Sequence, residues 1–564
     1  MGAKSTKQRA ANYLEESAGA TAKYQALRDL DIFVLDNSIR ESTVGQLRGH
    51  TLEAKWAIYE EVKKCGFKHT VVAAFSHMTR VDDDFIKELM ERGEDPYGLW
   101  AFSEITEGAK NKVPDTEAVP ISVRKLKAVG MYNVIFEVDL GDATYDFGKF
   151  TMADMCALVL KWIKWSHDNL GKNTKVMLNI RDPPDVMPYH PERVFELVEF
   201  LAKLPKNIRP FGILFEEPRG KSLPEEAGMW VKHIRATMKD NGWADGQLLV
   251  HVHEKFGYGD ATVLQCLIDG STGIWASVCA EGAALGNASS CVTLMNLIRL
   301  GNKKVLEKYN CTYLRKAAIN ATEITTGMLP HNKQPIFGPR ATDFVFDLTP
   351  EEFDLAAFFG EKAPIRITTM ASPDMILLHL KNLFGEDPQF TLDLAYKMKE
   401  LILEDLRTER KEEYMSAPGI AMLFDRAGGK LTEHMRDTIE AVDLKSANAT
   451  KLIKEIRAQW EEFDLKEGEQ GGVAGDDMLQ FDTFYNGFMA PYFSCYRCSD
   501  TYKALQAIDM DSDGQVDWSE FLVYLKWALY QYPNVETAQE VLNIAFTKGL
   551  IPAMRDEYLK QQAE

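Results

Sequence analysis

Short apolar runs alternate with helical patterns from about residue 30 to residue 290. A brief apolar run between polar residues indicates a buried strand, whereas apolar residues spaced three or four apart indicate a helix. Gly66 and Gly93 follow two helical patterns, and Pro191 and Pro224 open two others, as helix ends and first turns favour these residues. The predicted strands are Ile32–Asp36, Thr70–Phe75, Gly98–Phe102, Asn133–Val138, Lys175–Ile180, Phe211–Phe215, Leu248–His251 and Gly273–Val278.

Eight strand–helix repeats in about 260 residues predict an α/β fold, a parallel (β/α)8 TIM barrel. A doubly wound sheet is the alternative, although it usually has fewer strands. In a barrel the chemistry lies at the C-terminal ends of the strands, so candidate catalytic residues are expected there.

The rest of the 564-residue chain is long enough for further units. Residues 349–450 have helical patterns, with an apolar stripe at Leu392–Leu406, and no residues there suggest chemistry. The predicted division is an N-terminal segment (1–28), the barrel (29–300), a post-barrel segment (301–348), a helical region (349–450), an EF-hand pair (451–532) and a helical tail (533–564).

Composition narrows the class of protein. A net charge of −19 argues against nucleic-acid binding, which needs clustered Lys and Arg. No apolar run approaches the roughly 18 residues needed to span a bilayer, and no secretory segment is recognisable. Eight cysteines, mostly in apolar segments, predict reduced thiols and a cytoplasmic protein. Cys495 and Cys498 form a lone CxxC pair, which is weak evidence for zinc.

The first six residues fit the pattern for N-myristoylation on Gly2. Lys4, Lys7 and Arg9 add the positive charge that a single acyl chain needs for stable binding to an acidic leaflet. The pattern is loose, and a short disordered start explains it equally well. Any membrane contact is expected to be peripheral and reversible.

The seventh predicted strand ends in His251 and His253. Positions i and i+2 of a strand point the same way, so both imidazoles can reach one metal ion. Taken alone, such a pair is more often two surface histidines at a strand end. Other ligands must therefore come from other strand ends.

The first and eighth strands supply such ligands. Glu41 follows the first strand and offers a carboxylate, and Asn287 follows the eighth and offers an amide carbonyl. This mixed nitrogen and oxygen set suits Mg²⁺ or Mn²⁺, with Zn²⁺ as an alternative, and leaves positions open for two substrate oxygens. Arg40 is permanently charged and would stabilise an enolate or carboxylate, so Arg40 and Glu41 are the catalytic candidates.

These residues resemble a family of metal-dependent barrels that perform Claisen condensations or lyase reactions. The family includes isopropylmalate, homocitrate and citramalate synthases and hydroxymethylglutaryl-CoA lyase, and its barrel is also called pyruvate carboxyltransferase-like. The segment Thr326–Gly338 is similar to the post-barrel segment of the synthases, so the resemblance covers roughly residues 30–345. The motifs that carry it are Asp36-Asn-Ser-Ile-Arg40-Glu41, His251-Val-His253 and Gly286-Asn287.

The chain also departs from that family. The sixth strand ends in Glu216 and Glu217 instead of the family's Asp-Thr, which removes a threonine that helps to hold a keto-acid carboxylate. Arg219 is a candidate replacement, and Arg181, at the end of the fifth strand, is a second substrate-binding candidate. Asp343 stands near the place of the synthases' Gly-Ile-His motif, so the histidine usually supplied there is absent.

The C-terminal region contains the most specific motif, a twelve-residue calcium loop with apolar flanking segments. Its upstream partner, at about residues 456–488, has the wrong loop length and no alternating carboxylates, which predicts a degenerate first hand. One working site is typical of either a sensor or a structural ion. The predicted Ca²⁺ ligands are Asp509, Asp511, Asp513, Gln515, Asp517 and Glu520, with Gly514 at the sharp turn.

The resemblance implies an acyltransferase of the isopropylmalate synthase type that joins an acyl-CoA to a 2-oxo acid, and we expect a homodimer. Calcium is expected to regulate it, because such synthases often carry a C-terminal feedback domain and the EF-hands occupy that end. A lyase or aldolase on the same barrel is the first alternative. A calcium-sensing scaffold that has lost turnover is the second.

Overall fold

The structure is a computed structural model in which the chain divides into two compact units, residues 1–342 with 350–363 and residues 343–349 with 364–564. It describes residues 6–22, 24–43, 48–75, 80–171, 173–282, 286–343, 353–361, 363, 365–407, 414, 417–432, 434–435, 447–469, 475–489, 508, 514–531 and 534–545.

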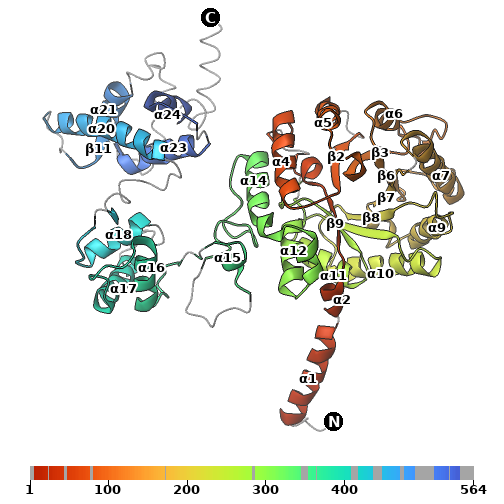
Figure 1. Cartoon of the computed structure of the whole chain (residues 1–564), viewed down its shortest axis with the longest axis horizontal. Helices are drawn as coiled ribbons and strands as arrows, with labels where there is room; N and C mark the ends of the chain where they lie inside the picture. Colours follow the sequence, from red (N-terminus) through yellow and green to blue (C-terminus); the bar gives the residue numbers. More distant parts are fainter. Residues whose placement is uncertain are drawn as a thin grey trace, which may run out of the picture. The chain divides into compact units, whose positions relative to one another are not determined.

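The first unit contains a closed barrel of eight parallel strands (Figure 1). The strand order around the barrel is β1, β10, β9, β8, β7, β6, β3, β2, and the pairing of Asp36 with Thr70 closes it. The predicted (β/α)8 barrel is therefore confirmed, and each predicted strand is present with its ends shifted by at most two residues. The strands are β1 (Phe33–Asp36), β2 (Thr70–Ala74), β3 (Leu99–Glu104), β6 (Asn133–Asp139), β7 (Val176–Arg181), β8 (Gly212–Glu217), β9 (Gln247–Val252) and β10 (Gly273–Ala276).

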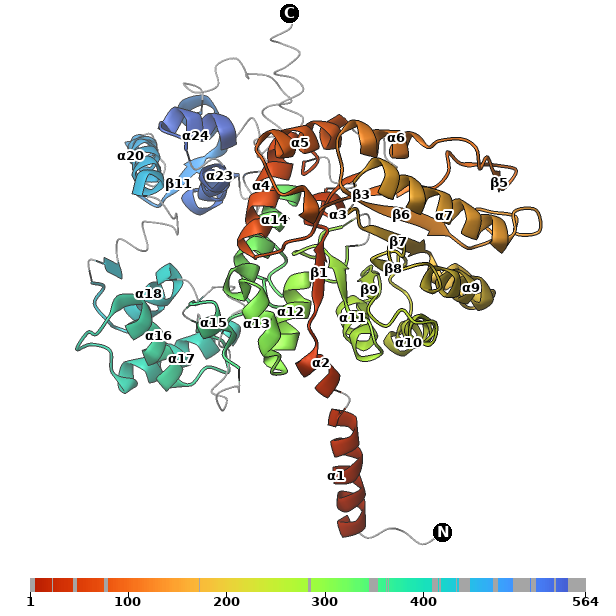
Figure 2. The same ribbon diagram turned by 45° about the vertical axis from the view of Figure 1, so that its right-hand side comes forward.

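Helices surround the barrel on the outside (Figure 2). Pro191 and Pro224 occupy the first turns of α9 and α10, as predicted, and Thr151 and Asp154 form a capping box at the start of α7. The helices that follow the eight strands are α4 (Leu52–Lys64), α5 (Arg80–Glu91), α6 (Ile121–Ala128), α7 (Met152–Asn169), α9 (Pro191–Ala202), α10 (Pro224–Asp240), α11 (Gly259–Ile268) and α12 (Ser290–Arg299).

The remaining elements of this unit lie before, between and after the repeats. The short hairpin of β4 and β5 was not expected from the sequence, and it occupies the loop between β3 and α6. These elements are α1 (Thr6–Ala22), α2 (Gln25–Asp29), α3 (Ser38–Glu41), η1 (Pro96–Gly98), β4 (Ala109–Lys110), β5 (Val113–Pro114), α8 (Pro183–Val186), α13 (Lys303–Lys308), η2 (Cys311–Tyr313), α14 (Leu314–Thr326) and α15 (Leu355–Phe358).

The second unit has two apolar cores. One joins α16, α17 and α18, and the other surrounds Trp460, whose ring stacks on Phe521 at 5.3 Å. The helical character predicted for residues 349–450 agrees with the elements described there. The elements are α16 (Pro373–Phe384), α17 (Leu392–Arg407), α18 (Ala417–Arg426), α20 (Ala447–Glu469), β11 (Met478–Gln480), α21 (Phe481–Thr483), η3 (Phe484–Phe488), β12 (Gln515–Asp517), α23 (Trp518–Gln531) and α24 (Ala538–Ile544).

The predicted calcium loop is only partly within the described residues. Gly514 has φ +84°, and β12 pairs antiparallel with β11, with Leu479 opposite Val516. Asp517 and Glu520 each accept the other's backbone N–H at the start of α23. Asp509, Asp511 and Asp513 lie outside the described residues, as do Gly2, Cys495 and Cys498, so the predictions for them remain predictions.

The described cysteines are Cys65, Cys156, Cys266, Cys279, Cys291 and Cys311, and all six are free and buried. Among the described helices, none combines the length and the apolar character needed to cross a bilayer.

Candidate metal centre at the barrel mouth

Alternation along the barrel strands places polar side chains directly above an apolar floor. Successive residues of a strand point to opposite faces, so the residue two positions after an inward one also points inward. The floor is the buried cluster of Leu35, Val71, Ala74, Trp100, Phe102, Ile135, Met177, Leu214, Leu249 and Trp275. Two positions later on β3, β6, β7, β8 and β9 come Glu104, Glu137, Asn179, Glu216 and His251, which we call the mouth residues.

His251 and His253 point to one place, as the sequence predicts. Their Nε2 atoms lie 3.2 Å apart, and both side chains are buried. The Nδ1 of His251 lies 2.8 Å from the backbone carbonyl oxygen of Trp275, which can only accept, so Nδ1 carries the proton and Nε2 keeps its lone pair. Burial is the largest of the causes that lower the pKa of His251 to about 3, so this imidazole is neutral at physiological pH.

Glu41 completes a group of three metal-ligand atoms. The ligand atoms of Glu41, His251 and His253 all lie within 4.8 Å of one another, and Glu41 Oε1 is 3.9 Å from His253 Nε2. Ligands about 2.1 Å from one ion lie roughly 3 to 3.5 Å apart, so a small closure brings all three into coordination. Nδ1 of His253 has no hydrogen-bond partner among the described residues, so it does not fix which nitrogen of this ring is protonated.

Asn287 lies beside this group. Its backbone forms an isolated β-bridge with His253, and its side-chain amide donates to the carbonyl oxygen of Glu281 at 2.8 Å. A Cβ atom on Gly282 would lie 2.6 Å from Asn287 Nδ2 and 3.2 Å from Glu41 Oε1, so only glycine leaves this corner open. The backbone bridge thus puts Asn287 next to His253, its Oδ1 accepts from Ser277 Oγ at 3.3 Å, and coordination by this oxygen remains a prediction.

Arg40 lies beside the metal group and over the apolar floor. It pairs with Glu41, and its guanidinium carbon lies 5.0 Å from the centre of the Phe102 ring. Burial opposes its charge, but the fields of Glu41, Glu137 and Glu216 outweigh burial and raise the pKa of Arg40. The guanidinium therefore stays positively charged, and its role toward an enolate or carboxylate remains a prediction.

The two predicted substrate-binding arginines have different surroundings. Arg181 ends β7, and although burial opposes its charge, Glu137 and Glu216 raise its pKa. Arg219 forms ion pairs with Asp185 and with Asp182, whose Oδ1 lies 3.4 Å away. Arg181 thus belongs to the mouth, whereas the guanidinium of Arg219 is occupied by two carboxylates, and contact of either with a substrate remains a prediction.

Glu104 and Glu137 were not predicted as site residues, and Glu216 was noted only as a departure from the motif of the family that the sequence resembles. Burial is the largest cause that raises the pKa of Glu137 to about 7, while Arg181 and Arg40 act in the opposite direction. Glu216 accepts a hydrogen bond from Nδ2 of Asn179 at 2.7 Å. The signal that could have found them is the same alternation that identified the histidine pair.

A buried ion pair supports the segment that carries Arg40 and Glu41. Lys55 Nζ lies 2.9 Å from Asp82 Oδ1 and donates to the carbonyl oxygen of Ile39 at 3.2 Å and to Thr43 Oγ1 at 3.4 Å. Asp82 in turn accepts the backbone N–H of Ala74 at 3.1 Å. Lys55 therefore ties α3 to the β2–α5 region, and this role was also missed.

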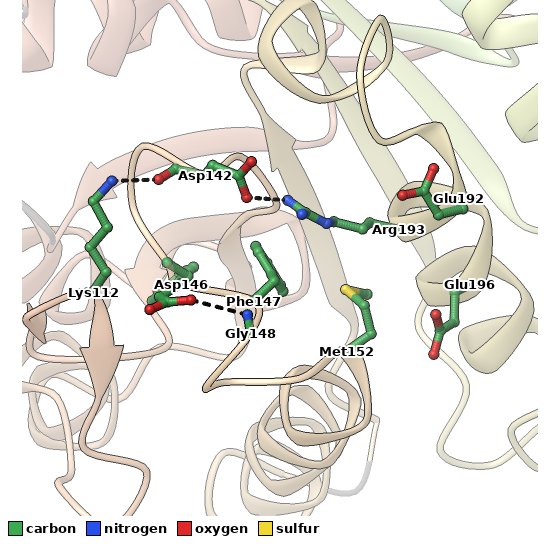
Figure 3. Close-up of a pocket in the computed structure, with 10 residues that line it drawn as sticks. Lys112, Asp142, Asp146, Phe147, Gly148, Met152, Glu192, Arg193 and Glu196 are labelled. Carbon is green, nitrogen blue, oxygen red and sulfur yellow. Dashed lines mark hydrogen bonds and ion pairs between the residues drawn. The ribbon is translucent and has the colours of Figure 1, made fainter.

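A separate hollow of about 670 Å³ lies beside the loop that follows β6 (Figure 3). Its two cations are already engaged, because Lys112 donates to the carbonyl oxygen of Asp142 and Arg193 donates to the carboxylate of Asp142, each at 2.7 Å. None of the predicted site residues lines it, and we assign it no function.

The chain matches no protein-family model and no curated protein. Among solved structures, it is similar to the HMG-CoA lyase from Brucella melitensis, with 13% identity over 52% of this chain and 98% of that one and a TM-score of 0.38. The HMG-CoA lyase from Bacillus subtilis has 14% identity over 54% of this chain and 96% of that one, with a TM-score of 0.40. The carboxyl transferase domain of pyruvate carboxylase from Rhizobium etli has 12% identity over 94% of this chain and 78% of that one, with a TM-score of 0.38. At these scores the fold assignment rests on the strand pairing of the chain itself.

Proposed function

We propose that this protein is a divalent-metal-dependent enzyme that forms a carbon–carbon bond between a 2-oxo acid and an acyl-CoA. The observation that carries the proposal is the buried group of Glu41, His251 and His253 beside Arg40 at the mouth of the barrel. One carboxylate and two imidazoles leave coordination positions for two substrate oxygens, and a 2-oxo acid offers a carbonyl and a carboxylate oxygen in that arrangement.

A divalent ion held there would supply a Lewis acid able to polarise the substrate carbonyl. Glu41, His251 and His253 would hold the ion, with Asn287 as the proposed fourth ligand. Arg40 places its charge beside the carbonyl oxygen as negative charge develops on it. The apolar floor excludes water from below, which strengthens both interactions.

A lyase or aldolase on the same barrel is the second candidate, because the synthases' histidine has no counterpart near residue 343. Asp343, which stands near its place, is engaged with Arg366, whose Nε donates to it at 3.0 Å. A scaffold without turnover is the third candidate, and it makes a different prediction about the assay below.

The test of the proposed reaction is release of free CoA thiol from acetyl-CoA across a panel of 2-oxo acids, with Mg²⁺, Mn²⁺ or Zn²⁺ added. Wild-type protein is expected to release thiol with at least one 2-oxo acid, and Glu41→Ala is expected to release at least about 100-fold less because the ion loses its carboxylate ligand. Glu53→Ala, at an exposed position on α4, is the matched control and should behave as wild type. Silence of wild type across the panel would favour the lyase or the scaffold, which cleavage of 3-hydroxyacyl-CoA substrates then separates.

We also propose that calcium regulates this activity through the second EF-hand. The first hand has its carboxylates engaged already, since Asp464 accepts the backbone N–H groups of Gly475 (2.9 Å) and Asp477 (3.2 Å), and Glu467 accepts that of Gln480. This supports a first hand that is closed without an ion and a single working loop. Turnover is expected to change at least about twofold between a calcium chelator and micromolar calcium, the range of sensor loops. Equal rates in the two conditions, or the same response from Glu520→Gln, would exclude regulation through this loop.

A further inference from the structure

Glu137 lies across the barrel mouth from the metal group. The ligands come from the segments around β1 and β9, with Asn287 after β10, and these three strands are neighbours in the barrel. Counting around the closed sheet, β6 lies three strands from β1 and three strands from β9. A substrate chelated at the metal group would therefore extend over the floor toward β6.

The side chain of Glu137 stands directly above this floor. Ile135, two residues earlier on β6, belongs to the floor, so the alternation of the strand directs Glu137 inward as well. Its side chain is neither fully buried nor exposed, as expected for a residue at the opening. Among the described residues it has no hydrogen bond or ion pair of its own. Its carboxylate is therefore free to accept a proton from a ligand.

Charged groups face Glu137 from all sides of the mouth. Arg40 and Arg181 favour its ionised form, whereas Glu216 and Glu104 disfavour it, and burial disfavours it most. The resulting pKa of Glu137, about 7, suits a group that must both take and return a proton near neutral pH. Glu216 is a weaker candidate because one of its oxygens already accepts from Asn179.

We infer that Glu137 is the catalytic base and acid that removes and returns the proton on the carbon next to the substrate carbonyl. This inference rests on the metal group of the proposed function in its lyase or aldolase form, in which the 2-oxo acid itself becomes the enolate. The carboxylate oxygen of Glu137 takes the proton, the C–H electron pair becomes the carbon–carbon double bond of the enolate, and the carbonyl π electrons move onto oxygen beside Arg40. The reverse step returns a proton from Glu137 to carbon, and no oxidant or second substrate is required.

The first test is exchange of the methyl hydrogens of pyruvate in D₂O, followed by NMR with the metal-loaded full chain and without acyl-CoA. Wild type is expected to exchange them, and Glu137→Gln is expected to be at least about 100-fold slower, the usual contribution of a positioned acid or base. The control is Glu117→Gln, because that side chain is 92% exposed, and it should match wild type. Metal content equal to wild type shows that Glu137→Gln keeps the folded metal site.

The second test measures protons instead of turnover. The carboxylates of Glu41, Glu104, Glu137 and Glu216 are balanced by Arg40, Arg181 and one divalent ion, so a bound dianion adds charge that favours protonation of Glu137. Calorimetry with oxalate, a planar dianion that resembles the enolate of pyruvate, is done near pH 7 in two buffers of different ionisation enthalpy. Wild type is expected to take up a measurable fraction of a proton, and Glu137→Gln is expected to take up less.

The outcomes separate the inference from the proposed function. Exchange by wild type with equal exchange and equal proton uptake by Glu137→Gln overturns the role of Glu137 and leaves the function standing. Absence of exchange in wild type with every metal overturns the role of Glu137, whereas the proposed function falls only if wild type is also silent in the thiol-release and cleavage assays.

Discussion

Full-length protein that carries both His251→Ala and His253→Ala is expected to retain less than about a tenth of the divalent metal bound by wild type. Two of the three buried ligand atoms are then missing, and a single carboxylate with an amide binds such an ion only weakly. The measurement is elemental analysis of purified protein after calcium has been removed with a chelator. Because burial holds the pKa of His251 at about 3, wild type should lose no metal through protonation of this nitrogen between pH 5 and pH 8.

The matched control for this double variant is His233→Ala, because His233 is exposed on α10, outside the barrel. It should retain the wild-type amount of metal. Unchanged metal content in the double variant would mean that the ion is held elsewhere in the chain, and the proposed function would lose its basis.

The eight strands and the histidine pair could be predicted from the sequence because each depends on a local pattern. A buried parallel strand needs a short apolar run, and the runs that end in Asp36 and His251 are clear of their neighbours. The chain order of Arg40, Glu41, the histidine pair and Asn287 then placed them at strand ends. A closed barrel brings all strand ends to one rim, so their proximity followed from the fold class alone.

The acidic mouth residues could not be predicted with the same ease, because their meaning depends on closure of the barrel. Glu137 and Glu104 end ordinary apolar strands, and a carboxylate at a strand end usually faces water. Only the register of β3 with β6, which sets Glu104 opposite Glu137, shows that these charges share one confined space. The pKa values of these carboxyl groups depend on burial and on charges from other strands, and neither can be read from one segment of the sequence.

The buried ion pair that supports the segment of Arg40 and Glu41 could not be predicted, for a different reason. Lys55 and Asp82 lie on two helices, α4 and α5, where lysine and aspartate normally mark the solvated face. In the structure Lys55 is 1% exposed and Asp82 4% exposed. In the sequence, a charged residue in a helix is interpreted as exposed unless a partner of opposite charge on a neighbouring helix is known.

Lys55→Met is expected to destabilise the barrel by about 3–5 kcal/mol and to weaken metal binding by about 10- to 100-fold. Removing one partner of a buried ion pair leaves the carboxylate of Asp82 without its compensating charge, which accounts for the loss of stability. The Ile39 carbonyl and Thr43 flank Arg40 and Glu41 and lose the ammonium that ties them to α4, so the carbonyl keeps only the hydroxyl of Thr43, 2.7 Å away in the same segment. This accounts for the loss of affinity. Hydrogen exchange of peptides from β1 and β2, measured in the full chain, reports the stability, since one unfolding transition is not expected for several units.

The double variant Lys55→Met, Asp82→Leu separates these two effects. Replacing a buried ion pair by apolar groups is often neutral, so the exchange protection of β1 and β2 should largely return. Metal affinity should stay low, because the Ile39 carbonyl still lacks the donor that holds α3 in place. Lys87→Met, on an exposed part of α5 where the lysine is 73% exposed, is the control and should change neither property. Recovery of metal affinity together with stability in the double variant would show that Lys55 acts only on folding and does not position Glu41.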